Sequence, residues 1–71
     1  MPLTIVQPGR CVRLVAVEAG QGLQGQLTAM GLVPGAEIQI LQNSPRGPFL
    51  IVVKGSRIML GRDMAGKIVV E

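Results

Sequence analysis

The side chains that could carry out acid–base or nucleophilic chemistry are few in this sequence. There is no histidine, so the usual proton shuttle near neutral pH is missing. The only acids are Glu18, Glu37, Asp63 and Glu71, and no two of them have the spacing of a working catalytic pair. The single cysteine, Cys11, has no histidine to activate it and is best interpreted as a small structural residue. These residues predict that the chain is not an enzyme.

Metal-ligating side chains are equally sparse. A tight zinc or iron site takes three or more histidine, cysteine or carboxylate ligands. One cysteine and four acids could form at most a weak surface site shared between molecules. Met30, Met59 and Met64 carry soft thioethers, but such side chains usually fill core space, and we expect that role here. We therefore expect no metal site and no cofactor.

The basic residues do not form a tract that would follow a nucleic acid. The formal net charge is +3, and the seven Lys and Arg residues are scattered along the chain. Proteins that bind single-stranded nucleic acid, and SH3 domains that bind proline-rich peptides, use several aromatic side chains. This chain has one, Phe49, and no Tyr or Trp. Composition therefore favours a protein-binding module. An oligonucleotide-binding barrel is a less favoured hypothesis.

Length and apolar patterning indicate one small domain, residues 1–71, in the cytoplasm. The longest apolar runs, 49–53 and 58–60, are far shorter than the roughly 20 residues that span a bilayer. The first eight residues lack the basic start and apolar stretch of a signal peptide. A single cysteine fits a reducing compartment. We expect no transmembrane segment.

The elements that would position a binding surface are mostly short strands. Apolar and β-branched residues predict strands at 11–17, 37–41, 49–54, 57–60 and 67–71, with a short helical turn within 61–66. Alternation places Val12, Leu14 and Ala16 on the core side of the first strand. Closing such strands into a barrel removes most exposed edges. The sequence thus predicts a mostly β fold, an SH3-like barrel of five to six short strands.

One short helix is predicted after the first strand, within residues 20–30. Leu23, Leu27 and Met30 follow one another at helical spacing and form a single apolar stripe. Gly31 comes next, as a helix-terminating residue in the left-handed conformation should, and Leu32 can fold back on the helix end. Gly25 inside the helix costs about 1 kcal/mol relative to Ala, which suggests a mobile helix or a close approach by a partner.

The helix end and the following turn carry a family resemblance. The pattern Leu27-x-x-Met30-Gly31-Leu32-x-Pro34-Gly35-x-x-Ile38 resembles the signature of the FeoA family of ferrous iron transport accessory proteins. The rest of the chain, roughly 3–70, agrees with that family in order and spacing. The resemblance implies a cytosolic, non-enzymatic SH3-like domain that binds the FeoB transporter and regulates or assembles it, which would place it at the inner membrane through FeoB.

The same resemblance leaves a second function open. Similar domains occur at the C-terminus of iron-dependent repressors, so a transition-metal-responsive, metal-binding domain is the alternative. This chain lacks the helix-turn-helix of such a repressor, which favours the accessory protein. Exposed strand edges could also pair two copies into a homo-oligomer.

For the partner-binding surface we predict the helix and the following turn, with Gln24, Gln26, Met30, Leu32 and Pro34 as contact residues. Related proteins commonly carry arginines just before the leucine at position 27, where this chain has glutamines and a glycine. The alternative surface is the loop 43–48. A purely structural role for Met30 and Leu32, as a helix stop with a buried cap, is an equally good interpretation.

Overall fold

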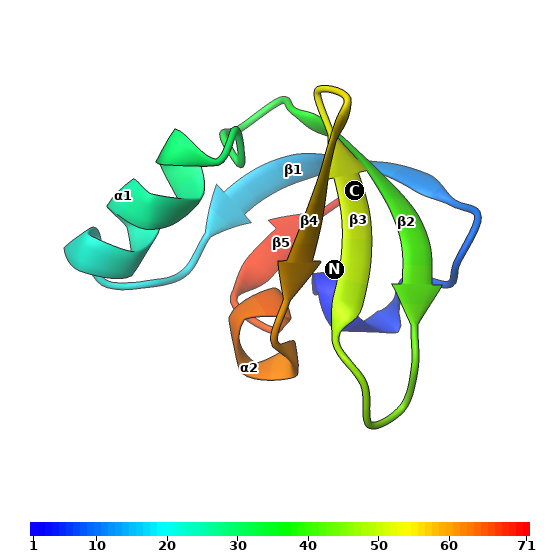
Figure 1. Cartoon of the computed structure of the whole chain (residues 1–71). Coiled ribbons are helices and arrows are strands. Elements are labelled where there is room, and N and C mark those ends of the chain that lie inside the picture. The colour runs from blue at the N-terminus through cyan, green and yellow to red at the C-terminus, as the bar shows by residue number, and fades with distance from the viewer.

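The computed structural model describes residues 1–71 and contains five strands, two α-helices and one 3-10 turn (Figure 1). The mostly β prediction, with one helix after the first strand, is confirmed, and β2 runs two residues further than predicted. The elements are η1 (Leu3–Ile5), β1 (Cys11–Val17), α1 (Gln21–Ala29), β2 (Glu37–Asn43), β3 (Phe49–Val53), β4 (Ser56–Leu60), α2 (Arg62–Ala65) and β5 (Ile68–Val70).

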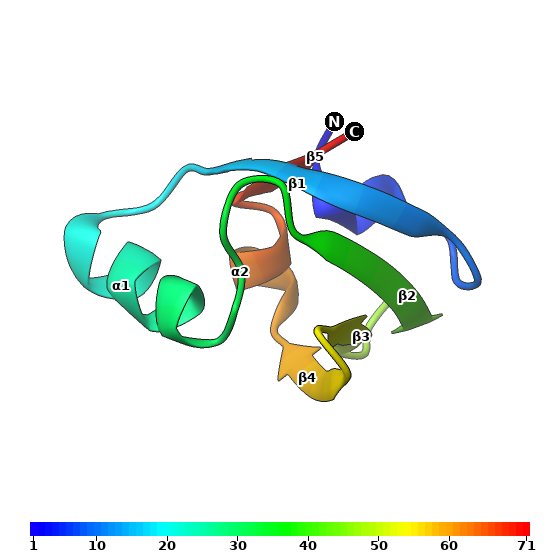
Figure 2. The same ribbon diagram turned by 90° about the horizontal axis from the view of Figure 1, so that it is seen from above.

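The five strands form one antiparallel sheet in the order β4-β3-β2-β1-β5. β1 pairs with two strands: its residues 11–13 pair with β2 and its residues 14–17 pair with β5. The register shifts between Leu14 and Ala16, where β1 changes partner, and again in β2 between Ile40 and Gln42. Such bulges bend a strand and raise its twist. Seen from above, the sheet curls from β1 round to β4, and α2 lies between β4 and β5 (Figure 2).

The core is made of the inward-facing side chains of this curled sheet. All 16 buried residues are apolar, and Phe49 in β3 is the largest of them. β3 alternates along its whole length, with Phe49, Ile51 and Val53 buried, and β2 alternates up to its bulge, with Ile38 and Ile40 buried. In β1 the predicted inward residues Val12 and Leu14 are buried, but Ala16 is only half-buried. The bulge before Ala16 interrupts the alternation there.

Two of the three methionines expected to fill the core, Met30 and Met59, are exposed instead. Met59 is 68% exposed and Met30 is 38% exposed, while Met64 is half-buried against the core. Met59 faces outward because it alternates with Ile58 and Leu60, whose side chains point to the inner face of β4. Met30 is the C-cap of α1 and lies beyond the turn that the core covers.

The N-terminal residues, for which the sequence predicts no element, cover the β5 edge of the sheet. Pro2 forms a bridge with Val69. The amino group of Met1 donates to the carbonyl oxygen of Val70 at 2.8 Å, and the Val70 N–H donates to the Met1 carbonyl at 2.7 Å. Leu3 in η1 is fully buried beneath this segment. The β5 edge is therefore occupied by the chain itself.

Candidate functional site

Helix α1 projects from the sheet and has little packing of its own (Figure 1). Leu27 is its one buried residue, and Leu23 is half-buried against the core. No side chain caps its N-terminus at Gly20, and residues 21–29 include no charged side chain. With two glycines and no ion pairs, the helix is intrinsically weak. It must therefore be held mainly through Leu27 and through its C-terminal end.

That C-terminal end is a Schellman motif, as the sequence predicts. Gly31 has φ +93°, which favours glycine. The Gly31 N–H donates to the Thr28 carbonyl at 3.0 Å, and the Leu32 N–H donates to the Leu27 carbonyl at 2.9 Å. Leu32 is 1% exposed and joins Leu27 in the core, which is the apolar contact expected of this motif. The structure therefore anchors α1 at its end and leaves the rest free.

The structure places four of the five predicted contact residues at the surface. Gln24, Gln26 and Pro34 are exposed, and so is Met30. Leu32 is a core side chain because closing the Schellman motif turns it inward, so it lies outside the exposed surface and fits the alternative interpretation of a buried helix cap.

The exposed glutamines do not share one face of α1. At about 100° per residue, Gln24 and Gln26 lie about 200° apart around the axis and flank the buried stripe on opposite sides. The face opposite Leu27 carries Gly22, Gly25 and Ala29 instead, and a Cβ at either glycine would meet no atom within 4 Å. The side chains at the centre of the exposed helix face are thus small and uncharged. Helical periodicity, applied to the small residues, would have identified it.

The alternative surface, the loop 43–48, is tied down at its base. Asn43 Nδ2 donates to the carbonyl oxygens of Thr4 at 3.2 Å and Val6 at 2.7 Å. Arg62 Nη1 donates to Asn43 Oδ1 at 3.0 Å and to the Ser44 carbonyl at 2.6 Å. The Arg62 guanidinium also lies 4.9 Å from the ring centre of Phe49. These side chains join the loop, η1 and α2, which is a structural role, and only the tip 45–48 stays free.

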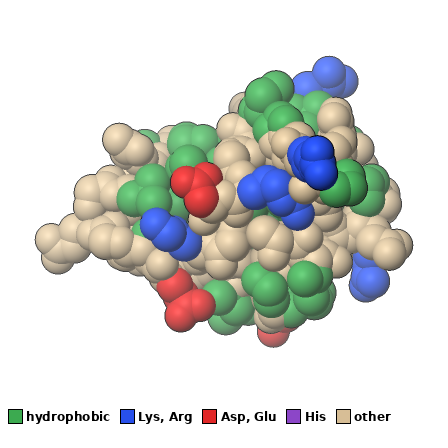
Figure 3. Space-filling view, turned by 90° about the horizontal axis from the view of Figure 1, so that it is seen from below, with side chains coloured by type: hydrophobic (Ala, Val, Ile, Leu, Met, Phe, Trp, Pro, Cys, Tyr) green, Lys and Arg blue, Asp and Glu red, His purple; other side chains and the backbone are tan.

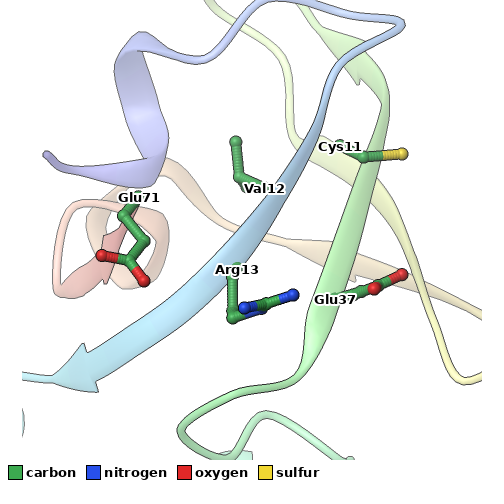
Figure 4. Close-up of a pocket in the computed structure, with 5 residues that line it drawn as sticks. All are labelled: Cys11, Val12, Arg13, Glu37 and Glu71. Carbon is green, nitrogen blue, oxygen red and sulfur yellow. The ribbon is translucent and has the colours of Figure 1, made fainter.

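An open pocket on the outer face of β1 and β2 brings several charged groups near Cys11. It is lined by Cys11, Val12, Arg13, Glu37 and Glu71 (Figure 4). Arg13 and Glu37 are register partners in the sheet, and Figure 4 shows Arg13 between the two carboxylates, with the thiol pointing away from Glu71. Although Cys11, Glu37 and Glu71 all line this pocket, no three His, Cys, Asp or Glu side chains of the chain are placed so that they could hold a metal ion together.

The charged side chains are dispersed over the face shown in Figure 3. Two Lys or Arg side chains adjoin near the middle of that face, and the others stand apart, with acidic, apolar and other side chains between them. A nucleic-acid groove needs a continuous basic track along the backbone path. This face has none. The chain also contains no helix with the length and apolar character needed to cross a membrane.

Comparison with known proteins gives one consistent result. The whole chain, residues 1–71, matches the model of the FeoA domain. A curated protein of Methanocaldococcus jannaschii, named as an Fe(2+) transport protein A, is 37% identical over 70 residues, which are 99% of this chain and 84% of that protein. A crystal structure of an iron uptake regulatory protein, FeoA, has a TM-score of 0.92 at 38% identity and covers 99% of this chain and 93% of that one.

More distant structures share the fold. FeoA of Stenotrophomonas maltophilia in complex with zinc, described as a prokaryotic SH3 domain protein, has a TM-score of 0.88 at 24% identity over 100% of this chain and 89% of that one. IdeR of T. acidophilum has a TM-score of 0.86 at 25% identity over 99% of this chain but only 32% of that one. The SH3-like prediction is confirmed. The full-length family match and the relatives above 30% identity show that this chain belongs to the FeoA family, a family of ferrous iron transport accessory proteins and not a known enzyme family.

Proposed function

We propose that this protein is a non-enzymatic accessory factor of ferrous iron uptake that binds the FeoB transporter and regulates or assembles it. Membership of the FeoA family supports this role, as does the similarity to the Fe(2+) transport protein A of M. jannaschii. The scarcity of catalytic side chains fits a protein that acts by contact. As a single domain of residues 1–71, it would work in the cytoplasm, at the inner membrane only through its partner.

The observation that carries the proposed contact surface is the exposure of α1. A helix interface built on Gly22, Gly25 and Ala29 lets a second backbone approach closely, because no side chain stands between the two. Gln24 and Gln26 would then offer hydrogen bonds at the two margins. We define the α1 surface as this outer face together with Met30 and Pro34 at its C-terminal end. Its lack of charge suits contact with an apolar or membrane-proximal part of FeoB.

Co-purification of this protein with full-length FeoB, and with the cytosolic GTP-binding part of FeoB, tests the proposal. Gln26→Glu and Pro34→Glu place a charge at the margin and the end of the α1 surface, and both should lose the complex. Gly25→Leu adds bulk without charge, so it should also lose the complex while the helix becomes more stable. The matched control is Gln39→Glu, which makes the same charge change at an exposed position of β2.

The outcomes separate the surface from the function. Full binding by all three variants would refute the α1 surface but not the FeoB partnership. No binding of FeoB by the unaltered protein, in detergent or in vesicles, would refute the partnership itself. Loss of binding by the Gln39→Glu control would mean that added negative charge, and not its position, breaks the complex.

A metal-responsive domain is the second candidate, favoured by the similarity of the chain to about a third of T. acidophilum IdeR. Against it stands the lack of any group of three His, Cys, Asp or Glu side chains that could hold a metal ion within one chain. A metal site would therefore have to be shared between molecules. Anaerobic calorimetric titration with Fe(II) and with Zn(II) decides between the two candidates, since tight binding of one ion per chain or per pair of chains would favour the metal-responsive domain.

A further inference from the structure

The two edges of the sheet are treated differently. At the β5 edge the N-terminal residues bridge Val69 and exchange hydrogen bonds with Val70. At the other edge β4 pairs with β3 alone, and no residue bridges its outer side (Figure 2). β4 contains no proline, and its register with β3 runs without a bulge from Val53–Ser56 to Phe49–Leu60. It therefore lacks most of the devices that keep another strand from pairing at an edge.

The turn before β4 determines which of its backbone groups are free. Lys54 and Gly55, with φ of 52° and 80°, form a two-residue turn of the I′ kind. Such a turn makes the flanking pair, Val53 and Ser56, a hydrogen-bonded pair. Alternation along the ladder then directs the N–H and C=O of Arg57 and Met59 away from β3. These two residues offer four unpaired main-chain groups in a row.

The side chains at this edge specify what could pair there. Arg57 and Met59 point to the outer face, where both are exposed, and Lys54 lies at the turn end of the strand. Residues 49–60 contain no Asp or Glu, so no acidic side chain in this segment offsets the positive charge of the edge. Met59 pairs with Leu50 in the register, which continues an apolar surface inward from the edge.

We propose that the β4 edge binds an extended, acidic segment of a partner protein by strand addition. An incoming antiparallel strand would place an acidic side chain beside Arg57 and an apolar one, two residues away, beside Met59. A second copy of this chain is the poorer occupant, because pairing two β4 edges brings Arg57 and Lys54 of both copies together in proteins of net charge +3. This inference concerns a surface apart from α1 and does not depend on FeoB being the partner.

Titration of the nitrogen-15-labelled full chain with a designed peptide tests the proposal. The probe is the end-blocked peptide Thr-Val-Thr-Glu-Thr-Glu-Thr, and the control peptide carries Lys in both Glu positions. The Glu peptide should shift the amide signals of Arg57 and Met59, and slow their hydrogen exchange, more than any other backbone signals. The Lys peptide should not.

Two pairs of variants make the test specific for the edge. Met59→Pro removes an outward N–H that bonds nothing in the fold, and should abolish binding, whereas Met59→Ala keeps that N–H and should retain it. Arg57→Glu should lower the affinity for the Glu peptide about tenfold. Losing an attraction and adding a repulsion each lower that affinity about threefold. Arg46→Glu, the same charge change in the β2–β3 loop, should have little effect.

Three results would overturn the proposal. Shifts centred elsewhere would place peptide binding on another surface. Equal binding by Met59→Pro and Met59→Ala would exclude strand addition. If the proline variant does not fold, equal binding by Arg57→Glu and Arg46→Glu would overturn the proposal instead. Concentration-dependent shifts of the Arg57 and Met59 amides without peptide would identify a second copy of the chain as the occupant.

Discussion

The same substitution, glycine to alanine, should have opposite effects at two positions of the α1 segment. Gly31 closes the helix in the left-handed conformation, at φ +93°. Gly25 lies inside α1 with ordinary helical geometry. Gly31→Ala should therefore lower the free energy of unfolding, and Gly25→Ala should raise it.

The expected magnitudes follow from what a Cβ would meet. At Gly31 it would lie 3.5 Å from Val53 Cγ1 and 3.7 Å from Lys54 Cδ, which is normal van der Waals contact. No clash adds to the backbone strain, so Gly31→Ala should cost about 1–2 kcal/mol. At Gly25 nothing lies within 4 Å, so alanine brings only its better helix propensity. Gly25→Ala should stabilise by about 0.5–1 kcal/mol.

Urea unfolding followed by far-UV circular dichroism measures both changes. The chain has no Trp or Tyr, so intrinsic fluorescence is of little use. The denaturant midpoint should move down for Gly31→Ala and up for Gly25→Ala, with an unchanged slope. In thermal unfolding of a domain of this size, each 1 kcal/mol corresponds to about 4–8 °C.

Each half of this prediction can fail separately. An unchanged midpoint for Gly31→Ala would refute the left-handed helix stop and with it the hydrogen bonds that anchor α1. A lower midpoint for Gly25→Ala would mean that the outer face of α1 is covered or that the helix is not formed in solution. Gly22→Ala, at a second open helical position, should behave like Gly25→Ala and serves as the replicate.

Three further changes test the packing of the fold, each by urea unfolding. Leu27→Ala removes the one buried residue of α1 and should cost about 2–5 kcal/mol, and a smaller loss would mean that the helix hardly contributes to the core. Asn43→Ala removes both donors to Thr4 and Val6 and should cost about 1–3 kcal/mol. Amide exchange should also become faster in η1, and unchanged exchange there would refute the anchoring role. Met59→Lys changes an exposed side chain and should stay within about 0.5 kcal/mol, unless the outer face of β4 is already covered.

Much of this fold could be predicted from local pattern. Alternation and turn residues predict the strands, and helical spacing followed by glycine predicts α1 and its stop, because side-chain period and backbone freedom are properties of short segments. The prediction that the chain is not an enzyme also rested on composition alone. The surface proposed for partner binding follows the helix and turn named from the sequence. Pattern alone left Leu32 open as either a contact residue or a buried cap, and the fold buries it.

What only the tertiary structure decided are the relations between distant segments. Three of these relations join residues far apart in the chain. β1 pairs with both β2 and β5, Met1 and Pro2 cover the β5 edge, and Arg62 donates a hydrogen bond to Asn43. The sequence determined that a short helix and short strands would form, and it predicts a protein that acts by contact. Which helix face and which strand edge stay exposed depended on how the sheet curls and on which segment covers each edge. Those are outcomes of three-dimensional packing, which no local spacing encodes.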